Sequence, residues 1–264
     1  MQRLDDEIEQ IPGLFPGWRL ELVQLGPRCD TTAVSCVAFR SHRILRLHAG
    51  SALAIRGSVP TRSSCVLFSA SQPANVRFLG QRLTPNRLVR AGAGAHVDLF
   101  VPSGADLMML VVESRQSMPR SGVLLYEDGN ATPRVLDELR VSAVVAACRL
   151  VDKRFPAPVT LTELSRHCGV AERTLEYGFR QVYDTTPLAF IRSQRLTRNR
   201  MALLSARAST SISDTARACG FTHMGQYCKD YRRLFGETPS TTLARRQFLL
   251  ARTGPPRDEG IDSA

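Results

Sequence analysis

The chain has 264 residues, 43% hydrophobic and 22% charged, which is enough for about two domains with buried cores. Its 35 Lys and Arg against 24 Asp and Glu give a net charge of +11, which favours an anionic partner such as nucleic acid or an acidic membrane surface. The longest apolar runs, Leu107 to Val112 and Val141 to Cys148, are far shorter than the roughly 18 to 20 residues that cross a bilayer, and Met1 to Gln10 does not resemble a signal peptide. We therefore expect a cytoplasmic protein with no membrane partner.

From Trp18 to about Val112, short apolar runs alternate with Gly, Pro, Ser and Arg. Runs of about four to eight residues at this spacing predict the strands of a sandwich or barrel. The expected strands are Trp18 to Leu25, Ala33 to Phe39, Ile44 to His48, Ser64 to Phe68, His96 to Val101 and Leu107 to Val112. The sequence therefore predicts a mostly-β domain over residues 1–132.

The pattern changes after Tyr126. Glu127 to Thr132 is typical of a polar turn, and Pro133 suits a helix start. Apolar residues then recur at helical spacing, and Phe155 to Pro158 ends the helix because proline cannot continue it. We interpret residues 133–158 as a linker helix and hinge. Its wide apolar stripe either packs on the barrel or pairs with a second subunit, and we expect a homodimer.

The rest of the chain contains an internal repeat. Thr160 to Glu163 is typical of a capping box, and Ser211 to Asp214 repeats that arrangement 51 residues later. Each box begins a short helix, and each helix ends at a glycine that can adopt a left-handed turn, Gly169 or Gly220. A second helix follows each glycine. The repeat therefore predicts two helix-turn-helix units.

A single unit of this kind often serves packing alone. Here, however, two copies are joined by a helix expected at about Pro187 to Ala206. Four arginines crowd this helix, namely Arg192, Arg195, Arg198 and Arg200. We interpret this crowding as favouring nucleic-acid binding over packing.

At these residues the sequence resembles the AraC/XylS family of transcription regulators. The resemblance extends over about residues 140 to 246 and rests on Gly169 to Leu175, Phe179-Arg180, Pro187, Arg195-Leu196, Ala216, Gly220-Phe221 and Tyr231 to Ser240. It implies an α+β multidomain fold, with a cupin-like barrel followed by an all-α domain of two helix-turn-helix units joined by a linker helix. We assign residues 159–252 to this DNA-binding domain and residues 253–264 to a flexible tail.

The resemblance also implies a function and partners. The protein is expected to be an activator that binds operator DNA and acts on RNA polymerase. Its first half is expected to sense a small-molecule effector or to mediate dimerisation. The sequence does not identify the effector-binding residues.

The DNA-contacting residues are expected on the second helix of each unit. They are Arg173, Thr174, Glu176, Tyr177 and Arg180 in the first unit, and His223, Met224, Gln226 and Lys229 in the second. By chemistry, Arg173 suits guanine, Glu176 suits the cytosine amino group, and Gln226 suits adenine. Met224 suits a thymine methyl group. Tyr177, Arg180 and Lys229 suit phosphate.

Two other functions remain open from the sequence. A metal-dependent cupin-type enzyme needs clustered His ligands and a carboxylate, whereas His42, His48 and His96 are isolated in the sequence. A ligand-binding module without operator recognition is the other alternative. We expect no catalytic residues, no metal and no cofactor.

Overall fold

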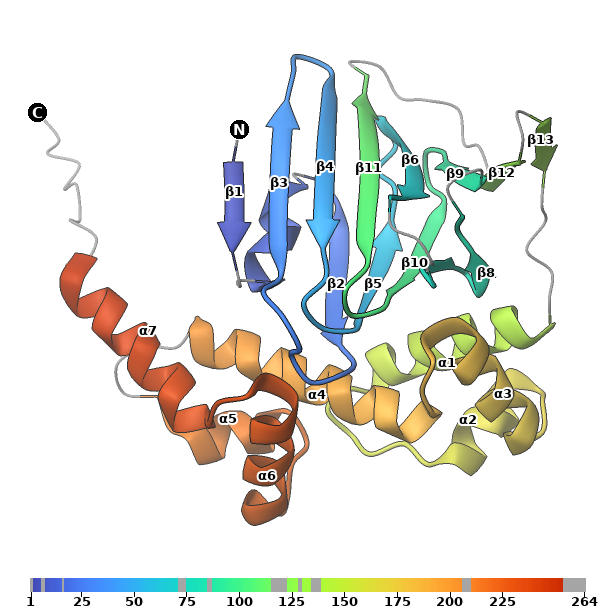
Figure 1. Cartoon of the computed structure of the whole chain (residues 1–264). Coiled ribbons are helices and arrows are strands. Elements are labelled where there is room, and N and C mark those ends of the chain that lie inside the picture. Colours follow the sequence, from blue (N-terminus) through green and yellow to red (C-terminus); the bar gives the residue numbers. More distant parts are fainter. Residues whose placement is uncertain are drawn as a thin grey trace, which may run out of the picture.

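The computed structural model describes residues 2–5, 8–15, 17–70, 75–84, 87–114, 123–127, 130–133, 139–205 and 210–253. A part built of strands precedes a part built of helices (Figure 1), which confirms the expected α+β organisation. The strands are β1 Gln2–Asp5, β2 Arg19–Gln24, β3 Ala33–Ala38, β4 His42–His48, β5 Leu53–Ser58, β6 Ser63–Ser69, β7 Arg77–Phe78, β8 Gln81–Arg82, β9 Arg87–Ala91, β10 His96–Val101, β11 Asp106–Glu113, β12 Val123–Glu127 and β13 Asn130–Pro133.

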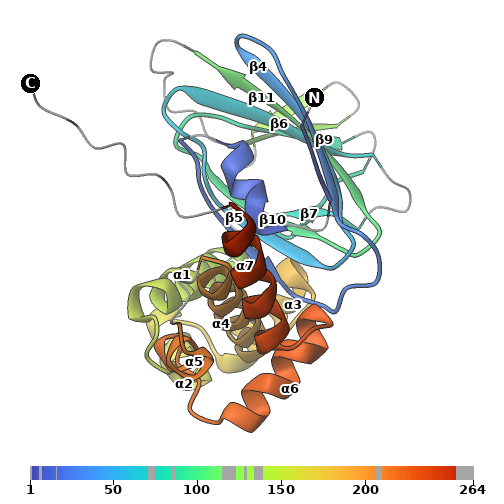
Figure 2. The ribbon, with the colours of Figure 1, turned by 90° about the vertical axis from the view of Figure 1, so that its left-hand side faces the viewer.

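The strands form two antiparallel sheets. The larger has the order β1-β3-β4-β11-β6-β9-β12-β13, and the smaller has the order β2-β5-β10-β7-β8. Burial alternates along β11, where Leu107, Met109 and Val111 are buried and the residues between them are partly exposed, because successive side chains point to opposite faces. The five-stranded sheet lies between the larger sheet and the helices (Figure 2).

The six expected strands are all present. The polar turn expected at Glu127 to Thr132 is wrong at Glu127 and at Asn130 to Thr132, which lie in strands, whereas Asp128 and Gly129 lie outside the described residues. The helix start expected at Pro133 is also wrong, because Pro133 lies in a strand. Strands β12 and β13 pair here, with Glu127 opposite Asn130, and Pro133 ends β13. Because β13 is the outermost strand, a proline there costs no hydrogen bond to a further strand. Strand β5 escaped prediction because four consecutive residues in it are buried, so it shows no alternation.

The helical part begins with α1, Leu139–Arg154, and continues through α2 to α7. Their bounds are α2 Leu161–Cys168, α3 Glu172–Tyr183, α4 Pro187–Leu204, α5 Ile212–Ala218, α6 Met224–Phe235 and α7 Pro239–Thr253. A 3-10 helix, η1 at Ile8–Leu14, precedes β2. No described helix is long and apolar enough to span a membrane. Of the expected tail, all but Thr253 lies outside the described residues.

Helix α1 packs against α2 and α3. It buries Val144, Ala147 and Cys148 there, so its apolar stripe is covered largely within the same chain. Gly178 on α3 permits this close approach, because a Cβ atom at that position would lie 2.9 Å from Val144 Cγ2 and 3.0 Å from the Arg140 carbonyl oxygen.

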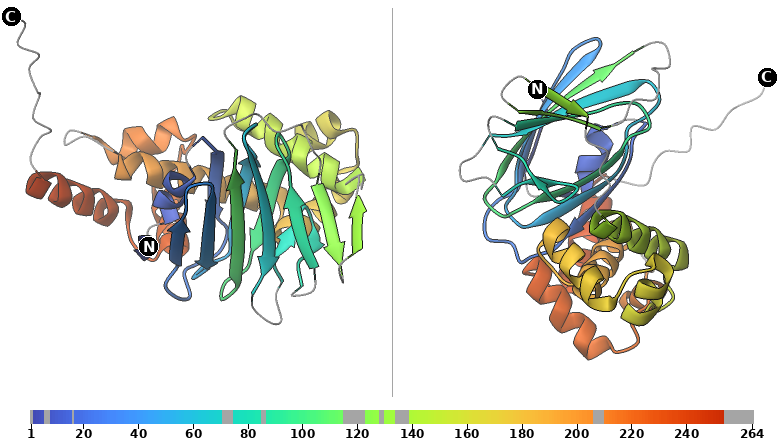
Figure 3. Two further views of the ribbon diagram at one scale, coloured as in Figure 1. Left: turned by 90° about the horizontal axis from the view of Figure 1, so that it is seen from above. Right: turned by 90° about the vertical axis from the view of Figure 1, so that its right-hand side faces the viewer.

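The buried apolar residues form two separate cores. The first continues from the space between the sheets into α1, α2, α3 and the start of α4. The right-hand view of Figure 3 shows the sheets stacked on these helices. The second core joins α4, α5 and α6 and contains Leu196, Leu203, Ala216, Tyr227, Tyr231, Leu234 and Phe235. The two sheets, called the barrel below, and the first helix-turn-helix unit therefore share one core, whereas the second unit has its own.

Candidate nucleic-acid interface

The first unit begins with the predicted capping box. Thr160 Oγ1 accepts a hydrogen bond from the Glu163 backbone N–H at 3.2 Å, and Glu163 Oε2 accepts one from the Thr160 backbone N–H at 2.9 Å. The Thr160 backbone bond, followed by the Arg154 side chain, lowers the pKa of Glu163 to about 2. Gly169 ends α2 with φ of 66°, a left-handed conformation that directs the chain into α3.

Helix α3 has one buried and one exposed face. Leu175, Phe179 and Val182 are buried, while Arg173 and Tyr177 lie on the opposite face. Arg173 Nη2 donates to Tyr177 Oη at 3.0 Å, and its guanidinium lies 5.5 Å from the centre of the Tyr177 ring. These contacts order both side chains before any partner binds.

The start of α3 lacks a side-chain cap, since Ala171 is the N-cap residue. Glu172 Oε1 instead accepts a hydrogen bond from Thr162 Oγ1 at 2.6 Å, which connects the first turn of α3 to α2. Its negative charge also lies at the helix N-terminus, where the helix dipole favours it. The Thr162–Glu172 hydrogen bond adds to the buried apolar contacts between α2 and α3, which include Leu164 and Leu175.

The second unit repeats part of this design. Ser211 Oγ accepts from the Asp214 backbone N–H at 3.3 Å, while Asp214 Oδ1 accepts from Arg217 Nη1 at 3.0 Å, and Gly220 follows α5 with φ of 83°. Alanine would not fit at Gly220, because its Cβ atom would lie 2.5 Å from the Pro156 carbonyl oxygen. Helix α6 then buries Tyr227, Tyr231 and Leu234 on its inner face.

Asp230 on α6 is a site residue that the sequence analysis missed. It is buried, and it accepts a hydrogen bond from Gln226 Nε2 at 3.1 Å. It also pairs with Arg192 of α4 and Arg233 of α6. Asp230 thus holds the Gln226 amide in one orientation. The Gln226-to-Asp230 spacing of four residues was the available signal.

The four arginines of α4 all have partners within the chain. This finding corrects our interpretation that their crowding favours nucleic-acid binding over packing. Arg192 pairs with Asp230, and Arg195 donates to the carbonyl oxygens of Ala157 at 2.8 Å and Gly220 at 3.3 Å. Arg198 pairs with Glu21 and Asp152, and Arg200 with Glu9 and Glu237. Three of the four arginines neutralise carboxylates, and Arg195 binds backbone carbonyl oxygens, so contacts within the fold explain their number.

Known proteins match parts of this chain. Residues 164–245 match the family model described as a helix-turn-helix domain. The probable thc operon regulatory protein of Rhodococcus erythropolis is 31% identical over 125 residues, covering 47% of this chain and 35% of that protein. XylDLEGF operon transcriptional activator 1 of Pseudomonas putida is 31% identical over 101 residues, covering 38% and 30%. The solved structure of a probable AraC family transcriptional regulator from Rhodopseudomonas palustris is 30% identical, covering 39% of this chain and 96% of that chain, with a TM-score of 0.37.

This chain belongs to the AraC/XylS family. The chain spans about a third of the length of the curated relatives it matches. The family-model match lies wholly within the helical part, between α2 and α7.

The AraC/XylS-type helical part brings most of the predicted contact residues to exposed positions. Arg173, Tyr177, Arg180, His223, Gln226 and Lys229 are exposed, and Thr174 and Glu176 are half-exposed. Met224 differs, because it is half-buried and packs against the core of the second unit. Its contact with a thymine methyl group stays a prediction, as do the other base assignments.

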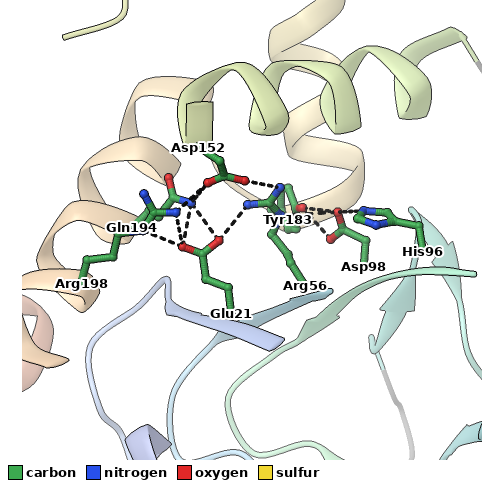
Figure 4. A network of polar contacts seen from close by, with 8 residues as sticks. All are labelled: Glu21, Arg56, His96, Asp98, Asp152, Tyr183, Gln194 and Arg198. Atoms are coloured by element: carbon green, nitrogen blue, oxygen red, sulfur yellow. Dashed lines mark hydrogen bonds and ion pairs between the residues drawn. The ribbon is translucent and has the colours of Figure 1, made fainter. Parts of the chain in front are cut away.

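A polar network joins the barrel of this AraC/XylS protein to its helices (Figure 4). Arg56 of β5 is buried and lies 3.1 Å from Glu21 Oε2 and 3.4 Å from Asp152 Oδ2. Gln194 Nε2 of α4 donates to the same two carboxylates. Tyr183 Oη of α3 donates to the buried Asp98, and burial together with that carboxylate raises the pKa of Tyr183, so the phenol stays protonated.

The three barrel histidines lie in different surroundings. His48 is 3.5 Å from Asp106 and 3.8 Å from Asp30, whereas His96 is 3.7 Å from Asp98. His42 hydrogen-bonds Ser41 at 2.8 Å. Within the described residues, no group of three or more His, Cys, Asp or Glu side chains has the arrangement of a metal site.

Proposed function

We propose that this protein is a sequence-specific DNA-binding transcription regulator of the AraC/XylS type. The observation that carries the proposal is the pair of helix-turn-helix units, each presenting exposed polar side chains on its second helix. We further propose that it is an activator, since the matched Pseudomonas putida protein is a transcriptional activator. It would act in the cytoplasm, on RNA polymerase, without catalytic activity of its own.

The dimensions of the helical part support binding to successive major grooves. Helix α4 has 18 residues, and at about 1.5 Å per residue it is roughly 27 Å long. Successive major grooves on one face of DNA are about 34 Å apart. The helix joins the two units over a distance of this order, so α3 and α6 could each enter one groove.

Specific roles follow from side-chain chemistry. Arg173, stacked on Tyr177, is suited to the two acceptors of a guanine edge. Gln226 is suited to adenine, because Asp230 fixes its amide and leaves Oε1 as an acceptor. Arg180 and Lys229 are exposed and suited to phosphate.

A small-molecule effector would act most directly where the two parts meet. A groove between η1, β2 and α4 has apolar walls at Leu20, Leu22 and Met201 and charged groups at Arg19 and Glu21. A ligand there would contact the barrel and α4 together. We propose this groove as the place to look for an effector.

The proposal is tested by selecting bound duplexes from a random pool with the full chain, at two salt concentrations. The full chain is needed because the first unit shares its core with the barrel. We expect two short conserved blocks about one helical turn apart and affinity that falls steeply with salt. A folded protein that enriches no sequence would contradict operator recognition and favour a ligand-binding module.

A further inference from the structure

The barrel contacts the C-terminal end of the first recognition helix, α3. Arg77 of β7 donates from Nη1 to the carbonyl oxygens of Arg180 at 2.9 Å and Gln181 at 3.0 Å. Its Nη2 lies 3.3 Å from Asp184 Oδ1. The Arg180 carbonyl oxygen also accepts a hydrogen bond from the Asp184 backbone N–H at 3.1 Å, so Arg77 adds a contact from the barrel to the cap that ends α3.

The same sheet also contacts the C-terminal end of the second recognition helix, α6. Gln24, at the end of β2, is buried and donates from Nε2 to the Leu234 carbonyl oxygen at 2.6 Å. Its backbone N–H donates to Thr197 Oγ1 of α4 at 3.2 Å. Removing one partner of a buried hydrogen bond leaves the other unsatisfied, which makes these contacts costly to break.

Both contacts originate from one hydrogen-bonded sheet. Strands β2 and β7 are three steps apart in the order β2-β5-β10-β7, which is about 14 Å at roughly 4.8 Å per step. The first unit is fixed further by the core it shares with the barrel. The second unit has its own core, so its position depends on α4, on Gln24 and on the Glu9–Arg200 pair.

We propose that the barrel sets the separation and relative rotation of α3 and α6, and thereby the spacing between the two half-sites that the protein accepts. Gln24 is the positioning residue for the second unit. This inference rests on the proposed function. Because one added base pair displaces a half-site by about 3.4 Å and rotates it by about 35°, a fixed helix pair should accept one spacing only.

The test uses the full-length protein and a set of duplexes in which the two selected blocks are moved apart or together by one and two base pairs. For the wild type, we expect a one-base-pair change to weaken binding at least about 10-fold, which is about 1.4 kcal/mol. For Gln24→Ala, we expect weaker binding at the best spacing. We also expect the loss of affinity caused by a one-base-pair change in spacing to fall to about 3-fold or less. Thr197→Val, which removes the hydroxyl that accepts from the Gln24 backbone N–H, should change the profile in the same direction.

The control is Arg46→Ala, which removes an ion pair with Asp106 within the eight-stranded sheet. It should leave the spacing profile unchanged. A Gln24→Ala protein that folds and keeps the wild-type profile would overturn the inference, while leaving the proposed function intact. A wild type that binds no duplex specifically would instead contradict the proposed function.

A second measurement does not depend on DNA. Spin labels at the exposed Cys228 of α6 and at Thr174→Cys of α3 report the distance between the recognition helices. The background carries Cys29→Ser and Cys168→Ser, because Cys29 is exposed and Cys168 is half-buried. We expect a narrow distance distribution that Gln24→Ala broadens. Equal widths in both proteins would show that Gln24 does not position α6.

Discussion

Single side chains decide what each recognition helix presents to DNA. Arg173 is held by Tyr177, and Gln226 is held by Asp230, so both are ordered in the free protein. Preorganised side chains lose less conformational entropy on binding than mobile ones. The pairs Arg173–Tyr177 and Gln226–Asp230 are therefore the residues at which base recognition is best tested.

We expect Arg173→Ala and Gln226→Ala each to weaken specific binding by about 1 to 3 kcal/mol and to relax selection at one base position. Binding to random DNA should stay nearly unchanged, because base contacts contribute little to it. Competition binding against specific and random duplexes measures both effects. Arg217→Ala, on the exposed surface of α5, is the matched control. Equal losses on the two kinds of duplex would contradict base reading by Arg173 and Gln226.

Alanine substitutions at two glycines of the recognition helices should change the free energy of unfolding in opposite directions. Gly178→Ala places a Cβ atom 3.0 Å from the Arg140 carbonyl oxygen, and we expect it to lower the free energy of unfolding by about 1 to 3 kcal/mol. Gly225 has no neighbouring atom within 4 Å of the added Cβ atom. Gly225→Ala should raise the free energy by up to about 1 kcal/mol, since alanine favours the helix. Urea denaturation of the two variants measures both changes in the free energy of unfolding. A Gly178→Ala protein more stable than the wild type would show that α1 and α3 can move apart.

Among the secondary-structure elements, α2 depends on its first turn. The Glu163 carboxylate accepts hydrogen bonds from Thr160 and contacts Arg154, which lowers its pKa from 4.5 to about 2 in the folded state. The unfolded chain therefore binds this proton more readily than the folded one. Glu163 stabilises the fold fully above about pH 4.5 and loses that effect as the pH falls toward 2.

Glu163→Gln should therefore lower the unfolding midpoint near neutral pH and differ less and less from the wild type between pH 4.5 and 2. Thermal unfolding followed by circular dichroism across this range measures the difference. Ser165→Ala, which removes a hydrogen bond from the Ser165 hydroxyl to the Thr162 carbonyl oxygen in the same helix, should keep a constant offset from the wild type. A difference between Glu163→Gln and wild type that does not depend on pH would show that the carboxylate charge contributes nothing to the cap.

The repeat allowed the helices to be predicted, because caps and left-handed glycines are local signals. Thr160, Ser211 and Gly169 all have the predicted conformation or contact. The contacts that orient the site were not predictable in this way. Gln24 lies 210 residues from Leu234 in the sequence, and Arg77 lies 103 residues from Arg180. Only the folded chain brings such pairs together. A strand such as β5, with four consecutive buried residues, also lacks the alternation of apolar and polar residues that would identify it in the sequence.

At the scale of the whole molecule, the outer face of the eight-stranded sheet lies away from the helices (Figure 2). Val37 of β3, Ile44 of β4, Leu110 of β11 and Val66 of β6 form a row of paired positions across this face. Val37 and Ile44 are 37% and 40% exposed, and Phe39 beside them is 61% exposed. A contiguous apolar surface of this kind is typical of an association site, and we propose that a second copy of the chain packs against it.

If so, Ile44→Glu should convert a dimer into a monomer, because two-fold symmetry would place two buried carboxylates close together. Light scattering after size-exclusion chromatography measures the mass. Arg62→Glu, which also adds a carboxylate to the barrel but at an exposed turn outside the row, should leave the mass unchanged. A monomeric wild type, or a dimeric Ile44→Glu protein, would contradict this assignment.

The two cores also determine which parts of the molecule open together. Because the barrel and the first unit share one core, their amides should exchange with solvent in a single cooperative opening, although one part is β and the other α. The second unit, with its smaller core of seven residues, should open on its own and at lower free energy. Native-state hydrogen exchange should therefore show two groups of amides with different opening free energies. The boundary between the two groups should lie within α4, not at the junction between strands and helices. Recognition of one half-site would then be lost and regained while the other half-site stays bound.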